Sequence, residues 1–89
     1  MPEVAVTLPA ALVALFPGSP RRVTVSAETV TEAFAALDRN WPGMRDRLCD
    51  SIPAIRRHIN VFVDGERATL QTRLAPGAEM FIVAAISGG

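Results

Sequence analysis

The chain has 89 residues, of which 49% are hydrophobic and 20% are charged, and this length allows one modest core but no deep catalytic pocket. Nine acidic residues balance nine basic ones, which excludes the basic surface typical of proteins that bind nucleic acid or anionic membranes. Cys49 is the single cysteine, so an internal disulfide is excluded. We find neither a leader peptide nor an apolar run of membrane-spanning length, and we expect a cytoplasmic protein.

The first part of the chain is expected to form a β-hairpin. Residues 4–8 alternate large apolar side chains with smaller or polar ones, a period of two that predicts a strand with one buried face. Residues 21–27 alternate in the same way and predict a second, antiparallel strand. Residues 10–16 between them are apolar, but Pro17-Gly18-Ser19-Pro20 follows directly. We therefore expect residues 10–16 to form a packed connection rather than a helix.

A helix is expected to begin after Thr29. Thr29 and Glu32 have the spacing of a capping box, in which the threonine hydroxyl accepts from the glutamate amide and the carboxylate reaches back to the cap. Apolar residues then recur at helical spacing on one face, at Val30, Ala33, Phe34, Leu37 and Trp41. Pro42-Gly43 ends this pattern, and residues 44–48 add at most one further turn.

The second half of the chain predicts three more strands. In residues 59–63 the residues of one face, Ile59, Val61 and Val63, alternate with Asn60 and Phe62 on the other, which predicts a strand. Asp64-Gly65 follows as a strong hairpin-turn signal, and residues 66–69 predict a short strand after that turn. Residues 78–86 predict the final strand. The order of elements predicts an α+β fold of the β-grasp (ubiquitin-like) type, a mixed sheet of four to five strands with one main helix packed on one face. The helix supplies the crossover that would let the first and last strands pair in parallel at the centre.

The predicted strands also carry apolar side chains that point away from the core. In the final strand, Met80 and Ile82 fall on one face, whereas Phe81 and Val83 fall on the other. Phe62 has the same outward phase in the strand that ends at the hairpin. We predict that Phe62, Phe81 and Val83 form an exposed surface that docks a partner protein. A shift of the alternation by one residue would instead bury them.

The sequence ends in Ile86-Ser87-Gly88-Gly89, directly after the apolar strand. Glycine has no Cβ, so Gly88 and Gly89 can lie extended in a channel too narrow for a side chain. We expect residues 86–89 to form a flexible tail on a single domain of residues 1–89. In this interpretation Gly89 presents a carboxylate to a partner, and Ile86 and Ser87 contact that partner. The alternative is a tail without a chemical role.

Three segments carry a family pattern: residues 29–33 at the helix start, residues 59–66 in the third strand, and residues 81–89 at the end. In this combination the chain resembles the bacterial ubiquitin-like sulfur carriers of the MoaD/ThiS family, especially its CysO-type and MoaD-type members. The resemblance covers nearly the whole chain. The chain departs from the family pattern in the proline-rich loop of residues 10–20 and at Ser87, where related tails often carry Ala or Thr.

The resemblance implies a protein co-substrate rather than an enzyme. An adenylyltransferase of the ubiquitin-activating type would convert Gly89 to an acyl-adenylate, and a persulfide or sulfide would displace AMP to leave a thiocarboxylate. The sulfur would pass to a biosynthetic enzyme that makes cysteine, molybdopterin, a thiazole or another sulfur-containing metabolite. ATP and Mg²⁺ would belong to the activating enzyme, so we expect no cofactor or metal in this chain.

Two further functions are compatible with the sequence: a ubiquitin-like modifier joined to target lysines through Gly89, and a β-grasp interaction domain without chemistry. His58 has no second ligand at metal-binding spacing, and Cys49 has no basic partner that would activate it. We expect a surface histidine and an ordinary thiol. Arg21-Arg22 and Arg56-Arg57 are expected to be solvated surface rather than a steering patch.

Overall fold

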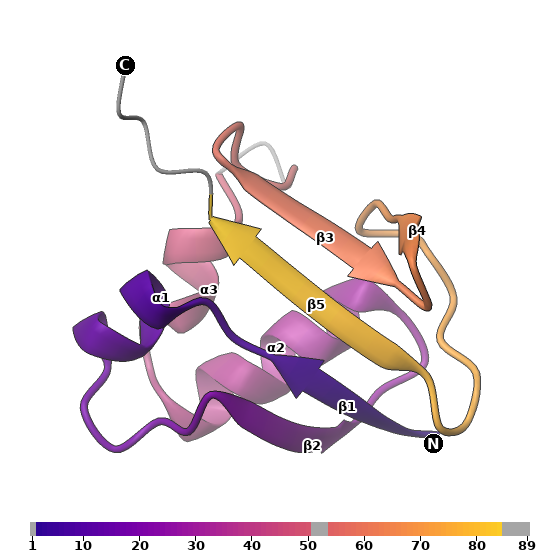
Figure 1. The fold of residues 1–89 in the computed structure, drawn as a ribbon, viewed down its shortest axis with the longest axis horizontal. Coiled ribbons are helices and arrows are strands. Elements are labelled where there is room, and N and C mark those ends of the chain that lie inside the picture. The colour runs from indigo at the N-terminus through magenta and orange to yellow at the C-terminus, as the bar shows by residue number, and fades with distance from the viewer. Residues whose placement is uncertain (1, 51–53, 85–89) are drawn as a thin grey trace.

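The computed structural model describes residues 2–50 and 54–84. Its elements in chain order are β1 Glu3–Thr7, α1 Ala10–Leu15, β2 Arg22–Ser26, α2 Val30–Asn40, α3 Met44–Leu48, β3 Ile59–Val63, β4 Glu66–Arg67 and β5 Glu79–Ala84. The strands form one five-stranded sheet in the order β2-β1-β5-β3-β4. This arrangement, drawn in Figure 1, confirms the predicted mixed sheet with one main helix.

The first and last strands lie side by side at the centre of the sheet. β1 and β5 pair in parallel, with Val6 opposite Met80, whereas β1 pairs with β2 and β5 pairs with β3 in antiparallel fashion. A parallel pair needs a long crossover, which the segment containing α2 provides. β5 is therefore held by hydrogen bonds on both sides, and its end at Ala84 leaves from the middle of the sheet.

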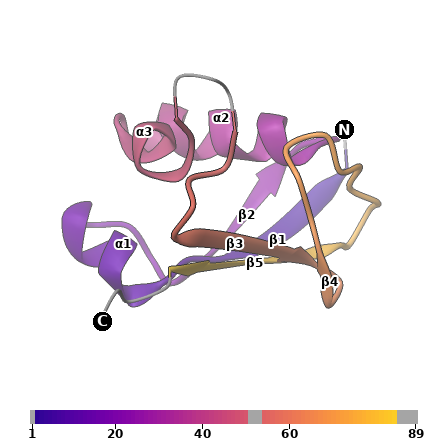
Figure 2. The same cartoon turned by 90° about the horizontal axis from the view of Figure 1, so that it is seen from above.

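One face of the sheet is covered by α2 and α3, as the view in Figure 2 makes clear. The core lies between these layers and consists of alternate strand residues and the apolar stripe of α2. Its largest fully buried side chains are Phe34, Leu8, Leu37, Met44, Leu48, Met80, Val4, Val6, Val30 and Val61. Trp41 packs against this core while remaining partly exposed. Because all the fully buried strand residues share one phase, the opposite phase must point away from the helices.

The predicted helix cap is present at Thr29. Its hydroxyl oxygen Oγ1 accepts a hydrogen bond from the amide of Glu32 at 3.2 Å. The Glu32 carboxylate accepts from the amide of Glu28 at 2.9 Å, which is one residue before the cap rather than at the cap itself. The box therefore satisfies two backbone donors at the helix start, as these residue types do at this spacing.

Residues 10–15 form a helix, so the prediction of a packed connection was wrong. The amides of Leu12 and Val13 both donate to the carbonyl of Pro9, at 3.0 and 3.1 Å, and this starts a turn that a short apolar segment would not hold alone. Burial of Leu12 in the core stabilises α1 from outside. The proline-rich loop after it limits the helix to six residues but does not prevent it.

The turn between β3 and β4 sets the register of the outer half of the sheet. Asp64 and Gly65 both have positive φ, 50° and 86°, as the two central residues of a type I′ hairpin turn require. The strand after the turn is shorter than the predicted 66–69, because the amide of Thr69 bonds to the side chain of Thr72 instead of a neighbouring strand. The last residues of the predicted 78–86 strand lie outside the described part of the chain.

Candidate functional site

An apolar surface lies on the face of the sheet opposite α2 and α3. Phe62 and Phe81 are directly opposite each other in the antiparallel pairing of β3 with β5, and Val83 is two residues further along β5. Phe81 is 42% exposed and Val83 is 45% exposed, whereas Phe62 is partly buried. We call these three residues the Phe81 surface. Within residues 2–50 and 54–84, no helix covers this face, as seen in Figure 2.

The outward direction of the Phe81 surface follows from the register of β5. Met80 is fully buried and Ile82 is 3% exposed, so the residues between them must point to the other side. The alternation therefore has the predicted phase, and the one-residue shift that would have buried Phe81 does not occur. Its role in docking a partner stays a prediction.

Three polar residues that the sequence analysis did not select border this surface. Thr7 pairs with Phe81 from the other side of β5, and Asn60 lies opposite Val83. The guanidinium of Arg67 donates to the side-chain oxygen of Asn60 at 2.6 Å. The phase of Thr7 was readable from its strand, but the position of Arg67 depends on the register set by the hairpin turn. The surface is thus an apolar centre with a polar rim, the pattern common in protein interfaces.

β5 is the central strand of the sheet, and residues 85–89 follow directly after its end at Ala84. Ala84 lies opposite Ile59 in the pairing with β3 and is the last described residue. The predicted site residues Ile86, Ser87, Gly88 and Gly89 lie outside the described residues, so their roles stay predictions. Five residues span at most about 17 Å when extended. A catalytic group that acts on Gly89 must therefore come within that distance of Ala84.

Cys49 is in a setting that keeps its thiol unreactive. It is 8% exposed, and burial raises the pKa of the Cys49 thiol above its ordinary value. The carboxylate of Asp50 also raises this pKa, and Arg45 and Arg56 oppose the rise without cancelling it. A raised pKa leaves little thiolate at neutral pH. The expectation of an ordinary thiol therefore holds, but its premise that Cys49 has no basic partner was wrong, because Arg45 and Arg56 lie close enough to act on the thiol.

The arginine pairs are more engaged with the fold than their expected role as solvated surface. The Nε of Arg21 donates to the carbonyl of Leu8 at 2.8 Å, and the guanidinium of Arg22 lies 3.7 Å from the carboxylate of Glu79. This ion pair is well exposed on both sides and contributes little to stability. In the second pair, Arg57 is exposed.

No metal site or membrane-spanning helix is found in the described part of the chain. Among residues 2–50 and 54–84, no group of three His, Cys, Asp or Glu side chains is placed to hold a metal ion. The helices of the same residues are too short or too polar to cross a bilayer. His58 is exposed and lies in the turn immediately before β3.

Comparison with known proteins places this geometry in a family. The model of the ThiS family matches residues 7–89, which includes every strand from the end of β1 and the terminal glycines. The chain belongs to the ThiS family. Among curated proteins it is similar to the sulfur carrier protein CysO of Mycobacterium tuberculosis, with 31% identity over 78 residues that cover 81% of this chain and 84% of the relative.

Solved structures share the same fold over nearly the full length. CysO in the Amycolatopsis orientalis BexX/CysO complex superimposes with a TM-score of 0.87 at 27% identity, covering 97% of this chain and 99% of that one. SAMP1 of Haloferax volcanii gives a TM-score of 0.82 at 32% identity, with 98% and 99% covered. These relatives establish the ubiquitin-like β-grasp fold of the chain and its place in a family that includes proteins named as sulfur carriers.

Proposed function

We propose that this protein carries sulfur as a thiocarboxylate on Gly89. The observation that carries the proposal is the family match, which runs through Gly88 and Gly89 and includes a relative named as a sulfur carrier. The position of β5 adds support, because a central strand gives the tail a rigid base. The proposal requires Gly89 to bear a free carboxylate.

The chemistry begins with activation, because a carboxylate is a poor electrophile. In the proposed reaction, an oxygen of the Gly89 carboxylate attacks the α-phosphorus of ATP, pyrophosphate leaves, and an acyl-adenylate forms. Hydrosulfide then attacks the acyl carbon and AMP leaves, so that a C–S bond replaces the C–O bond to AMP. An activating enzyme of the ubiquitin-activating type supplies the ATP and Mg²⁺ sites. The sulfur arrives either as sulfide or as a persulfide that a thiol cleaves to release hydrosulfide.

The chain itself contributes binding and positioning. The Phe81 surface docks the activating enzyme, and Ile86 and Ser87 lead the tail into a channel that only glycine fits. The thiocarboxylate on Gly89 is ionised at neutral pH and is a better nucleophile than the carboxylate. It passes its sulfur to an acceptor enzyme of cysteine, molybdopterin or other sulfur-metabolite synthesis, and the carrier is recycled. We place this cycle in the cytoplasm, where ATP is available to the activating enzyme.

A second function is favoured by one comparison. The structural neighbour at 32% identity is SAMP1, and proteins of that name are described as small archaeal modifier proteins. A modifier would use the same acyl-adenylate but would transfer Gly89 to a lysine amine instead of gaining sulfur. This chain contains no lysine, so it would not be its own target through a side-chain amine.

Intact-protein mass spectrometry tests the proposal. The protein is incubated with the activating enzyme encoded in the same genome, ATP, Mg²⁺ and a sulfide donor, and its mass is expected to rise by the difference between sulfur and oxygen. A chain with one alanine added after Gly89 is expected to gain no sulfur, because the reacting carboxylate is displaced by one residue. Gly88→Val should be blocked in the same way by its branched side chain. Both variants should unfold at the wild-type temperature.

A wild-type chain that never gains sulfur from such an enzyme would overturn the carrier function. High-mass conjugates formed under the same conditions, in the presence of lysine-containing proteins, would indicate the modifier instead.

A further inference from the structure

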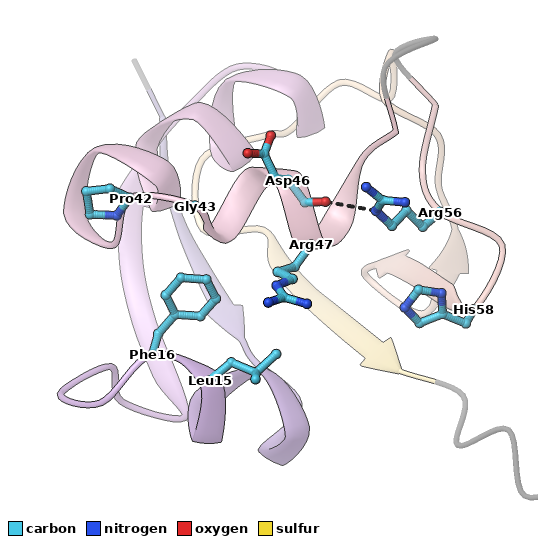
Figure 3. A pocket seen from close by; sticks show the side chains of 8 residues that line it. All are labelled: Leu15, Phe16, Pro42, Gly43, Asp46, Arg47, Arg56 and His58. Atoms are coloured by element: carbon cyan, nitrogen blue, oxygen red, sulfur yellow. Dashed lines mark hydrogen bonds between the residues drawn. The ribbon is translucent and has the colours of Figure 1, made fainter.

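A second surface feature lies away from the Phe81 surface, next to α1 and α3. It is an open cleft of about 690 Å³ between the end of α1 and α3. Figure 3 shows Leu15 and Phe16 on one wall and Arg47 directed toward them from α3. Arg56 and His58 line the cleft from the segment that leads into β3. One wall is thus apolar and the other is cationic.

Hydrogen bonds hold both walls in place. On the α3 side, one carboxylate oxygen of Asp38, in α2, accepts from the amides of Gly43 and Arg45 at 3.0 and 3.1 Å, which fixes the start of α3. The Nε of Arg56 donates to the main-chain carbonyl of Asp46 at 2.8 Å, so this guanidinium is anchored across the cleft edge. The cleft is therefore formed before any partner arrives.

The apolar wall is held by contacts at the end of α1. The hydroxyl of Ser19 donates to the carbonyl of Phe16 at 2.6 Å. The ring of Phe16 lies close above Gly43, because a Cβ at that position would be 3.6 Å from its edge. Leu15, in contrast, is 52% exposed and extends beyond this packed contact. It is an apolar side chain with no described neighbour that covers it fully.

The charge of the cleft favours an acidic occupant. Its lining includes the two guanidinium groups of Arg47 and Arg56, and Asp46 supplies the single carboxylate. In Figure 3 the Asp46 carboxylate points away from Leu15 and Phe16, so it does not neutralise the wall that Arg47 faces. An acidic side chain beside an apolar one would pair with Arg47 and cover Leu15 together.

The position of the cleft connects it to the reaction at Gly89. His58 directly precedes Ile59, the residue opposite Ala84 at the end of β5. α1 follows β1, whose last residue Thr7 lies beside Phe81 in the parallel pairing, so it starts at the same end of the sheet. Because the tail spans at most about 17 Å, an enzyme that takes up Gly89 must cover the surface around Ala84.

We propose that the cleft between α1 and α3 binds an acidic segment with an apolar side chain at the mouth of the activating enzyme's active site. This proposal rests on the proposed function, in which such an enzyme takes up Gly89. The Phe81 surface and the cleft then contact the enzyme on both sides of the tail. The acidic segment pairs with Arg47 and Arg56, and its apolar side chain covers Leu15.

The test measures ATP–pyrophosphate exchange by the activating enzyme as a function of carrier concentration. Arg47→Glu is expected to raise the KM for the carrier about tenfold with little change in kcat, because docking is weakened and the chemistry is not. The wild-type KM should rise with salt, and this dependence should be weaker in the variant. Leu15→Ser should raise KM several-fold without altering the salt dependence.

Arg73→Glu is the matched control. It makes the same change of charge at an exposed arginine that does not line the cleft. The main chain of Arg73 forms an isolated antiparallel β-bridge with that of Thr29, before the start of α2. Its KM should equal that of the wild type. Amide signals of isotope-labelled carrier provide a second measurement, since those of Gly43, Arg47 and His58 should broaden when the enzyme is added.

Four outcomes would overturn the proposal. If Arg47→Glu is activated with the wild-type KM, the sulfur-carrying function would stand, but the cleft would not be a binding site for the activating enzyme. Equal effects of Arg47→Glu and Arg73→Glu would indicate general charge attraction. Normal activation with slowed transfer to the acceptor would assign the cleft to that enzyme. A wild-type chain that is never adenylated would overturn the proposed function and this inference together.

Discussion

Truncating Phe81 should weaken activation of the carrier by an amount that the structure sets. A phenylalanine side chain presents roughly 150–250 Å², and Phe81 is 42% exposed. A partner can therefore remove roughly 60–100 Å² of it from water, and at about 25 cal/mol/Å² this corresponds to about 1.5–2.5 kcal/mol. The expected loss in affinity for the activating enzyme is about tenfold to seventyfold.

The assay is the carrier-dependent ATP–pyrophosphate exchange rate. Phe81→Ala should raise the KM for the carrier within this range, and Phe81→Asp should raise it further because docking would bury a carboxylate. Thr24→Asp is the control for charge, since Thr24 is exposed on the same face of the sheet, opposite Ala5 in the pairing of β2 with β1. Thermal unfolding of each variant separates docking from stability.

The reasoning would be refuted by Phe81→Ala that remains folded and is activated with a KM within twofold of the wild type. The exposed face of β5 would then have another role or none. A variant that fails to fold would contradict the assignment as well, because a side chain on the uncovered face should be dispensable for the core.

Two further predictions concern stability. Thr29→Ala removes the hydroxyl that accepts from the amide of Glu32 and should lower the free energy of unfolding by about 1 kcal/mol, or Tm by about 5 °C. Thr29→Ser should retain most of the wild-type stability. Urea titration of the three proteins measures these differences, and an unchanged stability of Thr29→Ala would show that the hydrogen bond contributes nothing. Burial raises the pKa of the Cys49 thiol in the folded protein, so the folded state holds its proton to higher pH than the unfolded state. The stability that the protonated Cys49 thiol contributes is complete below the ordinary thiol pKa of about 8.5 and is lost as pH rises through the pKa of this thiol in the folded protein. The free energy of unfolding should therefore fall more steeply above pH of about 8.5 in the wild type than in Cys49→Ala, and parallel curves would contradict it.

Local signals predicted most of the elements because their causes lie within a few residues. The cap at Thr29 needs only Glu32 three positions later, and the hairpin at Asp64-Gly65 needs only two residues that tolerate positive φ. Alternation in β5 was enough to assign Phe81 to the exposed face, since side chains in a strand change sides at every residue. The order of elements then allowed few topologies, of which the parallel β1–β5 pair is the one observed.

The helix α1 was missed because its stability does not come from its own residues. The segment 10–15 is too short to be helical alone, and it forms a helix because Leu12 is buried by strands and helices from elsewhere in the chain. The same holds for the raised pKa of Cys49, which depends on how deeply the surrounding elements enclose it.

The amino-acid sequence by itself determined the periodicities, the turns and the terminal glycines, and through them the β-grasp fold and the family. Only the tertiary structure decided which distant residues meet. Leu15, Arg47 and His58 come from separate parts of the chain, and no local pattern relates them. They line one cleft because α3 is fixed to α2 by Asp38, and because β1, which pairs with β5, leads into α1 at the end of the sheet where β5 also ends. Packing of whole elements, rather than any short-range preference, places them together.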